Sequence, residues 1–149
     1  MLHDVAIIGG AGGGLTAAIY TSRKKLSTIL IAKQIGGQCV LTDDIENYPG
    51  FEKISGIELS DKMRKQAEKY GVEIREGVIV ESIEKKPDSF LIKTKGGENI
   101  EAKAVIVATG KNPRRLNVPG EKEFENKGVV FCSICDAPLF GGKDVVVAG

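Results

Sequence analysis

The chain has 149 residues, of which 42% are hydrophobic and 28% are charged, and its formal net charge is +1. This composition is that of an ordinary globular protein, and no apolar run approaches the roughly 20 residues that span a bilayer. The even charge balance gives no reason to expect nucleic acid or a membrane as a partner, so small molecules and proteins remain.

The amino terminus runs directly into an apolar segment, without the basic region and small-residue cleavage site of a secretory signal. We therefore expect a cytoplasmic protein. The three cysteines, Cys39, Cys132 and Cys135, are too few for a disulfide framework. In a reducing compartment a close cysteine pair more often indicates metal binding or redox chemistry.

The first segments predict a β-α-β unit, which implies a parallel sheet. An apolar strand over Asp4–Ile8 leads into the glycine-rich stretch Gly9–Gly14, and the small and apolar residues of Leu15–Tyr20 favour a buried helix. A second β-branched strand follows at residues 28–32. Residues 33–54 carry no sustained hydrophobic period and predict an irregular loop, longer than loops without a function tend to be.

A helix is predicted from Ser55 to Tyr70. Its first residues, Ser55-Gly56-Ile57-Glu58, fit a capping box, and Gly71 can end it. The apolar residues at helical spacing are Ile57, Leu59, Met63 and Ala67.

The next segments predict a small antiparallel meander inserted into the parallel sheet. A strand is expected to begin at residues 72–74, and the meander strands at 78–80, 89–94 and 99–101 are separated by turn residues. The continuous apolar run at residues 104–108 predicts a further strand, buried on both faces, that returns to the parallel sheet.

After residue 110 the composition becomes polar, which predicts a linker or domain edge. Strands are expected at residues 128–131 and at Asp144–Ala148, where the pattern of strand followed by glycine repeats that of Asp4–Gly9. The predicted boundaries are a first domain over 1–112, a linker over 113–127 and the start of a second nucleotide-binding domain over 128–149.

The glycine-rich turn predicts dinucleotide binding. A pyrophosphate needs backbone N–H groups and a helix amino terminus at contact distance, and side chains would block that approach. The spacing Gly9-x-Ala11-x-x-Gly14 follows a strand and opens a helix, but it places Ala11 at the middle position of the fingerprint. The alternative is a tight strand-helix turn without a ligand. The acidic residue expected after the second strand to bind the ribose is absent, so we assign that contact to Lys33 or to backbone atoms.

The second constellation is Cys132-Ser133-Ile134-Cys135-Asp136. Two thiols at this spacing can close a small disulfide ring, and a helix amino terminus favours the thiolate that attacks a second disulfide. The carboxylate of Asp136 could move the proton. The alternatives are half of a zinc site, for which only Cys39 and His3 remain as ligands, or two inert buried cysteines.

Cys39 invites comparison with flavin reductases that carry a Gly-Gly-x-Cys-x4-Cys dithiol after the second strand. Gly36-Gly37-Gln38-Cys39 matches the first half, but the position of the second cysteine is Asp44. We therefore interpret Cys39 as a packing residue, and the single histidine, His3, in the same way.

The chain resembles the low-molecular-weight thioredoxin reductases and the related flavoprotein component of alkyl hydroperoxide reductase. The resemblance covers essentially the whole chain, in the family's order and approximate spacing. Its motifs are residues 9–20 (GGAGGGLTAAIY), 36–38 (GGQ), 44–51 (DIENYPGF), 107–110 (VATG), 118–121 (VPGE) and 132–143 (CSICDAPLFGGK).

The resemblance implies an α/β, Rossmann-like FAD-binding fold of three layers and a set of site residues. It implies that Cys135 faces the flavin, that Cys132 attacks the protein substrate and that Asp136 handles the proton. The implied FAD contacts are Gly9, Gly10, Ala11, Gly12, Gly13 and Gly14 at the pyrophosphate, Gly36, Gly37, Gln38 and Asn47 at the flavin, Val80 by the adenine, and Ala108, Thr109 and Gly110 over the cofactor. Ala137 departs from the glycine that usually follows the aspartate.

The resemblance also implies a cycle in which NADPH reduces FAD, FAD reduces the Cys132–Cys135 disulfide, and the dithiol reduces thioredoxin or a similar protein. The family is commonly homodimeric. The NADPH site and the last FAD-domain segment are expected beyond Gly149, so we expect a fragment that is inactive alone. The alternatives are the flavoprotein reductase of a peroxiredoxin system, disfavoured because no dithiol domain precedes Met1, and a non-catalytic FAD-binding module.

Overall fold

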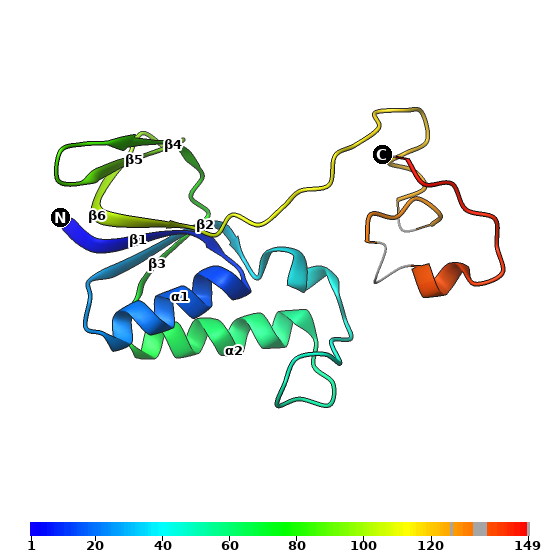
Figure 1. Ribbon diagram of the computed structural model, residues 1–149, viewed down its shortest axis with the longest axis horizontal. Coiled ribbons are helices and arrows are strands. Elements are labelled where there is room, and N and C mark those ends of the chain that lie inside the picture. The colour runs from blue at the N-terminus through cyan, green and yellow to red at the C-terminus, as the bar shows by residue number, and fades with distance from the viewer. Residues whose placement is uncertain (126, 133–136, 149) are drawn as a thin grey trace. The chain divides into compact units, whose positions relative to one another are not determined.

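The computed structural model describes residues 1–125, 127–132 and 137–148. The chain divides into two compact units, Met1–Gly110 (unit 1) and Lys111–Gly149 (unit 2). Unit 1 contains a six-stranded sheet and two α-helices, whereas the described residues of unit 2 contain little regular structure (Figure 1).

The predicted β-α-β unit forms the centre of unit 1. Strand β1 (Leu2–Gly10) pairs in parallel with β2 (Thr28–Ile35), and helix α1 (Gly12–Arg23) connects them. Helix α2 (Gly56–Lys69) then leads to β3 (Glu73–Glu76), which pairs in parallel with β2. The strand order β3-β2-β1-β6-β5-β4 places β1 in the interior of the sheet.

The meander is continuous with the parallel sheet, and this differs from the prediction. Strands β4 (Val80–Lys85) and β5 (Phe90–Thr94) pair antiparallel, and β5 pairs antiparallel with β6 (Asn99–Val107). Strand β6 also pairs in parallel with β1, so the two strands expected at 99–101 and 104–108 are a single strand. Lys103 interrupts the apolar run without ending the strand, because its exposed side chain reaches Asp4 on β1 (2.8 Å).

Unit 1 has a core on each face of its sheet, which gives three layers (Figure 1). Because side chains alternate along a strand, Ile7 packs toward helix α1 and its neighbour Ile8 packs on the opposite face. The second core also includes Ile92 and Ile100, so the antiparallel strands cover the face that the helices leave open. Each fully buried isoleucine contributes about 1.5–3 kcal/mol to folding.

Hydrogen bonds at the amino ends of the strands join three of them. The carboxylate of Asp4 accepts from Lys103 Nζ (2.8 Å) and from the backbone N–H of Ser27 (2.9 Å). These two donors lower the pKa of Asp4 below its ordinary value. His3 is buried, and its Nδ1 lies 3.3 Å from Ser27 Oγ, which agrees with its interpretation as a packing residue.

Helix α2 begins and ends as predicted, but its buried face is different. The side chain of Ser55 accepts a hydrogen bond from the backbone N–H of Glu58 (3.1 Å), and Gly71 follows the helix with φ of 79°. Leu59 and Ala67 are buried, whereas Ile57 is 64% exposed. The buried face starts at Gly56, whose position beside the carbonyl of Cys39 leaves no room for a Cβ atom.

We predict that Ser55→Ala destabilises the chain by about 1 kcal/mol, because it removes the acceptor for a helix N–H group. Urea denaturation measures the change. The control is Ser55→Asp, which keeps an acceptor at the cap and should stay within a few tenths of a kcal/mol of the original chain. Equal losses in both variants would show that the cap contributes nothing.

The predicted irregular loop contains some regular structure. Strand β2 extends to Ile35, a short 3-10 helix, η1, occupies Gly37–Leu41, and Ile45 forms an isolated antiparallel bridge with Ile54. The remainder of the segment between Thr42 and Ser55 has neither helix nor strand. The loop is therefore anchored at both ends.

The strands predicted at 128–131 and 144–148 do not form. In the described residues of unit 2 the only β contact is a bridge between Glu125 and Val129, followed by a four-residue 3-10 helix, η2, at Ala137–Phe140. Val146 and Val147 are 96% and 87% exposed. A strand needs a neighbour for its backbone hydrogen bonds, and no described segment pairs with 144–148.

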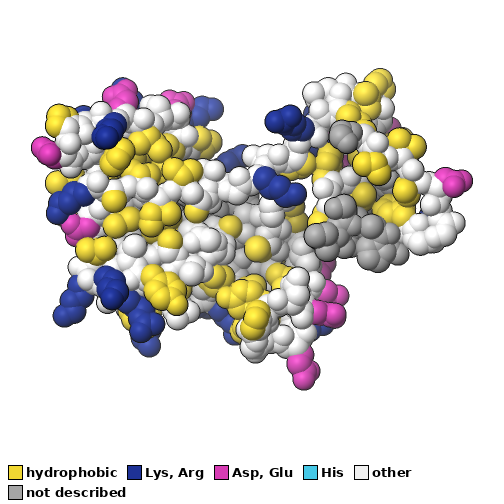
Figure 2. All heavy atoms as spheres, in the orientation of Figure 1, with side chains coloured by type: hydrophobic (Ala, Val, Ile, Leu, Met, Phe, Trp, Pro, Cys, Tyr) yellow, Lys and Arg dark blue, Asp and Glu magenta, His cyan; other side chains and the backbone are white. Residues whose placement is uncertain are grey.

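The carboxyl ends of the two helices are basic. Arg23 and Lys24 end α1, and Lys69 ends α2, where cations interact favourably with the helix dipole. Figure 2 shows basic side chains gathered at the lower left, at the end where both helices stop in Figure 1. Among the described residues, neither helix combines the length and apolar character needed to cross a bilayer.

Candidate functional site

The site is built where β1, β2 and β6 reach their carboxyl ends. The backbone N–H of Ala108, just after β6, donates to the carbonyl of Ile8 on β1 (2.8 Å). The backbone N–H of Gly36, just after β2, donates to the carbonyl of Gly10 (2.8 Å). Three segments that are distant in the sequence therefore meet at one edge of the sheet, where open α/β sheets place their ligands.

Two glycines of the turn are required by close backbone contacts. Gly9 has φ of 116°, and a Cβ added there would lie 2.1 Å from the carbonyl oxygen of Ala108. A Cβ on Gly14 would lie 1.8 Å from the carbonyl oxygen of Gly9. These contacts bring helix α1 tightly against the turn and against the end of β6.

The same turn has an open side at the amino terminus of α1. A Cβ on Gly12 would meet nothing within 4 Å, and one on Gly13 would meet only Ala108 Cβ at 4.0 Å. No side chain caps α1, and its first turn carries no acidic residue. The backbone N–H groups there can therefore approach an anion such as a pyrophosphate without steric or charge opposition.

Ala11, the departure from the glycine fingerprint, is accommodated by Gly37. A Cβ on Gly37 would lie 3.0 Å from the Ala11 methyl group, and Gly37 itself has φ of 54°. The methyl group of the turn thus occupies space that a side chain after β2 would otherwise need. The residues Gly36 and Gly37 are thereby brought beside the turn.

The other expected contact residues lie at different distances from this edge. Lys33 is an exposed residue near the end of β2, and Gln38 is exposed on η1. Thr109 and Gly110 continue from Ala108 and are exposed. Asn47 is exposed in the loop after η1, and the backbone contacts that join the three segments do not include it.

Glu76 at the end of β3 is a residue that sequence reasoning missed. Its carboxylate accepts from the backbone N–H of Ile35 (3.2 Å) and from Nη1 of Arg64 on α2 (2.8 Å). It therefore holds the end of β2, next to the position where the ribose-binding acid was expected. Its only sequence signal is an acidic residue at the end of a short strand.

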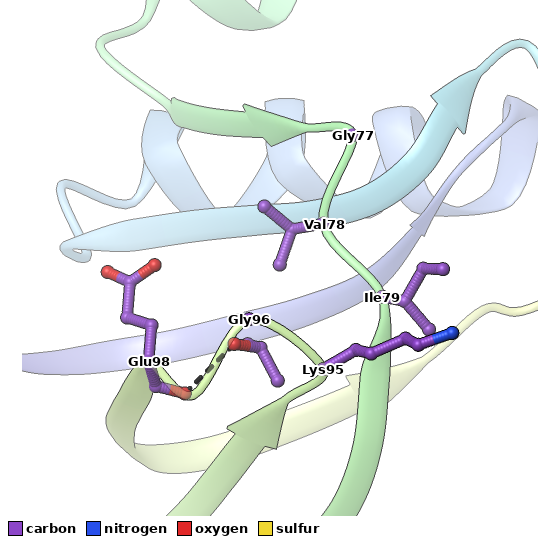
Figure 3. Close-up of a pocket in the computed structure, with 7 residues that line it drawn as sticks. Gly77, Val78, Ile79, Lys95, Gly96 and Glu98 are labelled. Carbon is purple, nitrogen blue, oxygen red and sulfur yellow. Dashed lines mark hydrogen bonds between the residues drawn. The ribbon is translucent and has the colours of Figure 1, made fainter.

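A pocket lies beside the expected adenine contact, Val80. One wall is Gly77, Val78 and Ile79, and the other is formed at the β5–β6 turn by Thr94, Lys95, Gly96 and Glu98 (Figure 3). The backbone N–H of Val78 donates to the carbonyl of Ala32 (3.1 Å), which ties this wall to β2. Val80 directly follows the pocket wall and packs against the second core.

The cysteines fall in both units. Cys39 on η1 is a free, partly buried thiol, whereas Cys132 in unit 2 is disulfide-bonded. Cys135 and Asp136 lie outside the described residues, so their predicted roles stay predictions. The described 3-10 helix begins at Ala137, after the cysteine pair, and it is too short to act as the expected α-helical amino terminus.

Comparison with known proteins places this arrangement in a family. A thioredoxin reductase from Bacillus subtilis is 47% identical over 149 residues, which are 99% of this chain and 46% of that protein. The flavoprotein-related relative from Staphylococcus aureus, a component of alkyl hydroperoxide reductase, is 42% identical over 147 residues, covering 99% of this chain and 29% of that protein. The chain thus spans less than half the length of either relative.

The crystal structure of thioredoxin reductase from Streptococcus pyogenes confirms the predicted fold class. It matches with a TM-score of 0.80 and 44% identity, over 93% of this chain and 45% of that one. The family model described as pyridine nucleotide-disulphide oxidoreductase matches residues 3–149. Because this match extends over nearly the whole chain, the protein belongs to the pyridine nucleotide-disulphide oxidoreductase family.

Proposed function

We propose that this chain supplies the FAD-binding segment and the redox-active dithiol of a thioredoxin reductase. The observation that carries the proposal is the open edge at the start of α1, where Gly12 and Gly13 leave space and no acidic side chain is present. Relatives named thioredoxin reductase support it, at 42% to 47% identity.

The residues at the sheet edge fit an FAD molecule in the following way. The backbone of Gly9–Gly14 would bind the pyrophosphate, and the segments Gly36–Gln38 and Ala108–Gly110 would flank the flavin. Lys33 and Val80 would contact the adenosine part, and Asn47 would reach the flavin from its loop. When bound, FAD would carry the electron pair from NADPH to a disulfide.

The dithiol would pass those electrons to a protein substrate. Cys132 would attack the substrate disulfide, Cys135 would face the flavin, and Asp136 would hold the proton that moves as a thiol forms. NADPH would bind a second nucleotide-binding domain, of which residues 128–149 are the proposed start. The proposed division keeps 1–112 as the FAD-binding domain and 113–127 as the linker.

The proposed protein partner is thioredoxin, and the proposed assembly is a homodimer in the cytoplasm, where a dithiol is maintained in a reducing pool. A second candidate is the reductase of a peroxiredoxin, because one relative is named as a component of alkyl hydroperoxide reductase. Disulfide reduction assayed with thioredoxin and with a peroxiredoxin as alternative substrates separates the two.

We predict that Gly12→Asp lowers FAD affinity by at least roughly tenfold, because it places a carboxylate beside the expected pyrophosphate. An acid in the first turn stabilises a helix, so folding should be retained. Titration with FAD, followed by quenching of flavin fluorescence, measures the affinity. Gly96→Asp is the control, because a Cβ at this β5–β6 turn glycine also meets nothing within 4 Å.

Equal affinity in Gly12→Asp and the original chain would contradict the assignment of the helix amino terminus to the pyrophosphate. Failure of the original chain to bind FAD would count against this segment as an FAD site by itself. A flavin spectrum bleached by dithionite but not by NADPH would favour a non-catalytic flavin-binding module.

A further inference from the structure

Arg115 in unit 2 is held in a way that ordinary surface arginines are not. Its Nη2 donates to both carboxylate oxygens of Glu125 (2.8 and 2.9 Å), and its guanidinium lies 5.4 Å from the centre of the Phe131 ring. Its Nη1 is buried without a hydrogen-bond partner, alone among the buried side-chain polar atoms of the described residues. An arginine that served only solubility would keep this donor in water.

The backbone on either side of this contact is fixed as well. Glu121 is 4% exposed, and its carboxylate accepts from the backbone N–H groups of Leu116 (3.0 Å) and Asn117 (2.7 Å), directly after Arg115. Glu125 bridges to Val129, whose backbone N–H donates to the carbonyl of Phe124 (2.9 Å). The segment 115–131 is therefore a small scaffold of its own.

The scaffold ends at the residue before Cys132. Phe131 is the ring on which Arg115 stacks, and Cys132 is disulfide-bonded in this arrangement. The Arg115 hydrogen bonds also lower the pKa of Glu125, so the ion pair is kept over the pH range in which thiols are studied. A side chain that fixes Phe131 restricts how the chain enters Cys132.

We propose that Arg115 is a positioning residue for Cys132, which it holds by stacking on Phe131 while Glu125 fixes its guanidinium. The inference rests on the proposed dithiol function. A held segment keeps the Cys132 sulfur close to its partner and so favours the disulfide over two free thiols. Loosening the segment makes the disulfide easier to reduce.

The experiment is a redox titration of the purified chain with dithiothreitol. Two thiols of dithiothreitol become a cyclic disulfide while the Cys132 disulfide takes up two electrons and two protons and opens to two thiols. Free thiols are alkylated and counted by mass, with Cys39 labelled in both states because it is free. This readout needs neither FAD, NADPH nor thioredoxin.

We expect Arg115→Lys to raise the equilibrium constant for reduction by roughly tenfold, which is about 30 mV, because lysine keeps the charge but loses the planar stack. Phe131→Leu should have the same effect. The matched controls are Arg114→Lys, at the exposed neighbouring arginine, and Phe131→Tyr, which keeps the ring. Both controls should titrate as the original chain does.

Unchanged constants in Arg115→Lys and Phe131→Leu would overturn this inference and leave the dithiol intact. An equal shift in Arg114→Lys would overturn it too, because any change of charge geometry would then suffice. A chain in which Cys132 forms no disulfide at any dithiothreitol ratio would overturn the proposed function together with the inference. If Arg115→Lys does not fold, the Phe131→Leu and Phe131→Tyr pair decides.

Discussion

Gly14→Ala is expected to destabilise the chain by about 3 kcal/mol or more, although it adds a single methyl group. The added Cβ would lie 1.8 Å from the carbonyl oxygen of Gly9 and 2.9 Å from its carbonyl carbon. Both atoms belong to the backbone of the turn, so no side chain can rotate away. Helix α1 would have to move from β1, and this would separate Leu15 and Ala18 from the first core.

The matched control for Gly14→Ala is Gly12→Ala, two residues earlier in the same helix. Its Cβ would meet nothing within 4 Å, and alanine is a better helix former than glycine. Its free energy of unfolding in urea should therefore equal or slightly exceed that of the original chain. Equal stability of the two variants would contradict the close approach of helix and turn.

The two glycine variants also separate fold from ligand. Gly14→Ala should lose FAD affinity and stability together, because it displaces the helix whose amino terminus binds the pyrophosphate. Gly12→Asp should lose affinity alone. The fingerprint spacing does not distinguish these roles, since every glycine in it is the same residue type. Only the neighbours of each missing Cβ separate them.

The parts of the fold that could be predicted depend on contacts between residues close in the sequence. The capping box at Ser55 and the strand-turn-helix around Gly9–Gly14 are of this kind, because their hydrogen bonds and steric limits arise within a few residues. The edge where Ala108 meets Gly9 is also predictable in outline, since parallel strands end together.

The wrong predictions concern places where a distant partner decides the local structure. A charged residue at Lys103 breaks the apolar run and predicts two strands, yet its salt bridge to Asp4 on β1 accommodates the charge within β6. The apolar pattern assigns Ile57 to the core, yet the contact of Gly56 with Cys39 sets which side of α2 is buried. Neither contact leaves a trace in local periodicity.

Unit 2 shows the same limit most clearly. Residues 144–148 have the composition of a buried strand, but β-propensity expresses packing against neighbours more than a backbone preference. Without a described partner their valines stay exposed. Arg115 gave no signal either, because a guanidinium stacked on Phe131 looks in sequence like any other arginine among polar residues.

Cys135→Ser in the full-length protein is expected to lower NADPH-dependent reduction of thioredoxin by about 1,000-fold or more, because the substrate-facing thiol can no longer be regenerated. Reduction of ferricyanide by NADPH should be retained, since it takes electrons from the flavin without the dithiol. Thioredoxin reduction and ferricyanide reduction, measured on one preparation, distinguish a lost dithiol from a lost cofactor.

Cys39→Ser is the matched control for Cys135→Ser. Cys39 is a free thiol on η1, beside the glycines that meet the turn, so it tests whether any cysteine near the proposed flavin site would serve. We expect thioredoxin reduction by Cys39→Ser to match that of the original protein. Unchanged thioredoxin reduction in Cys135→Ser would contradict the proposed electron path, and a loss confined to Cys39→Ser would transfer the redox role to η1.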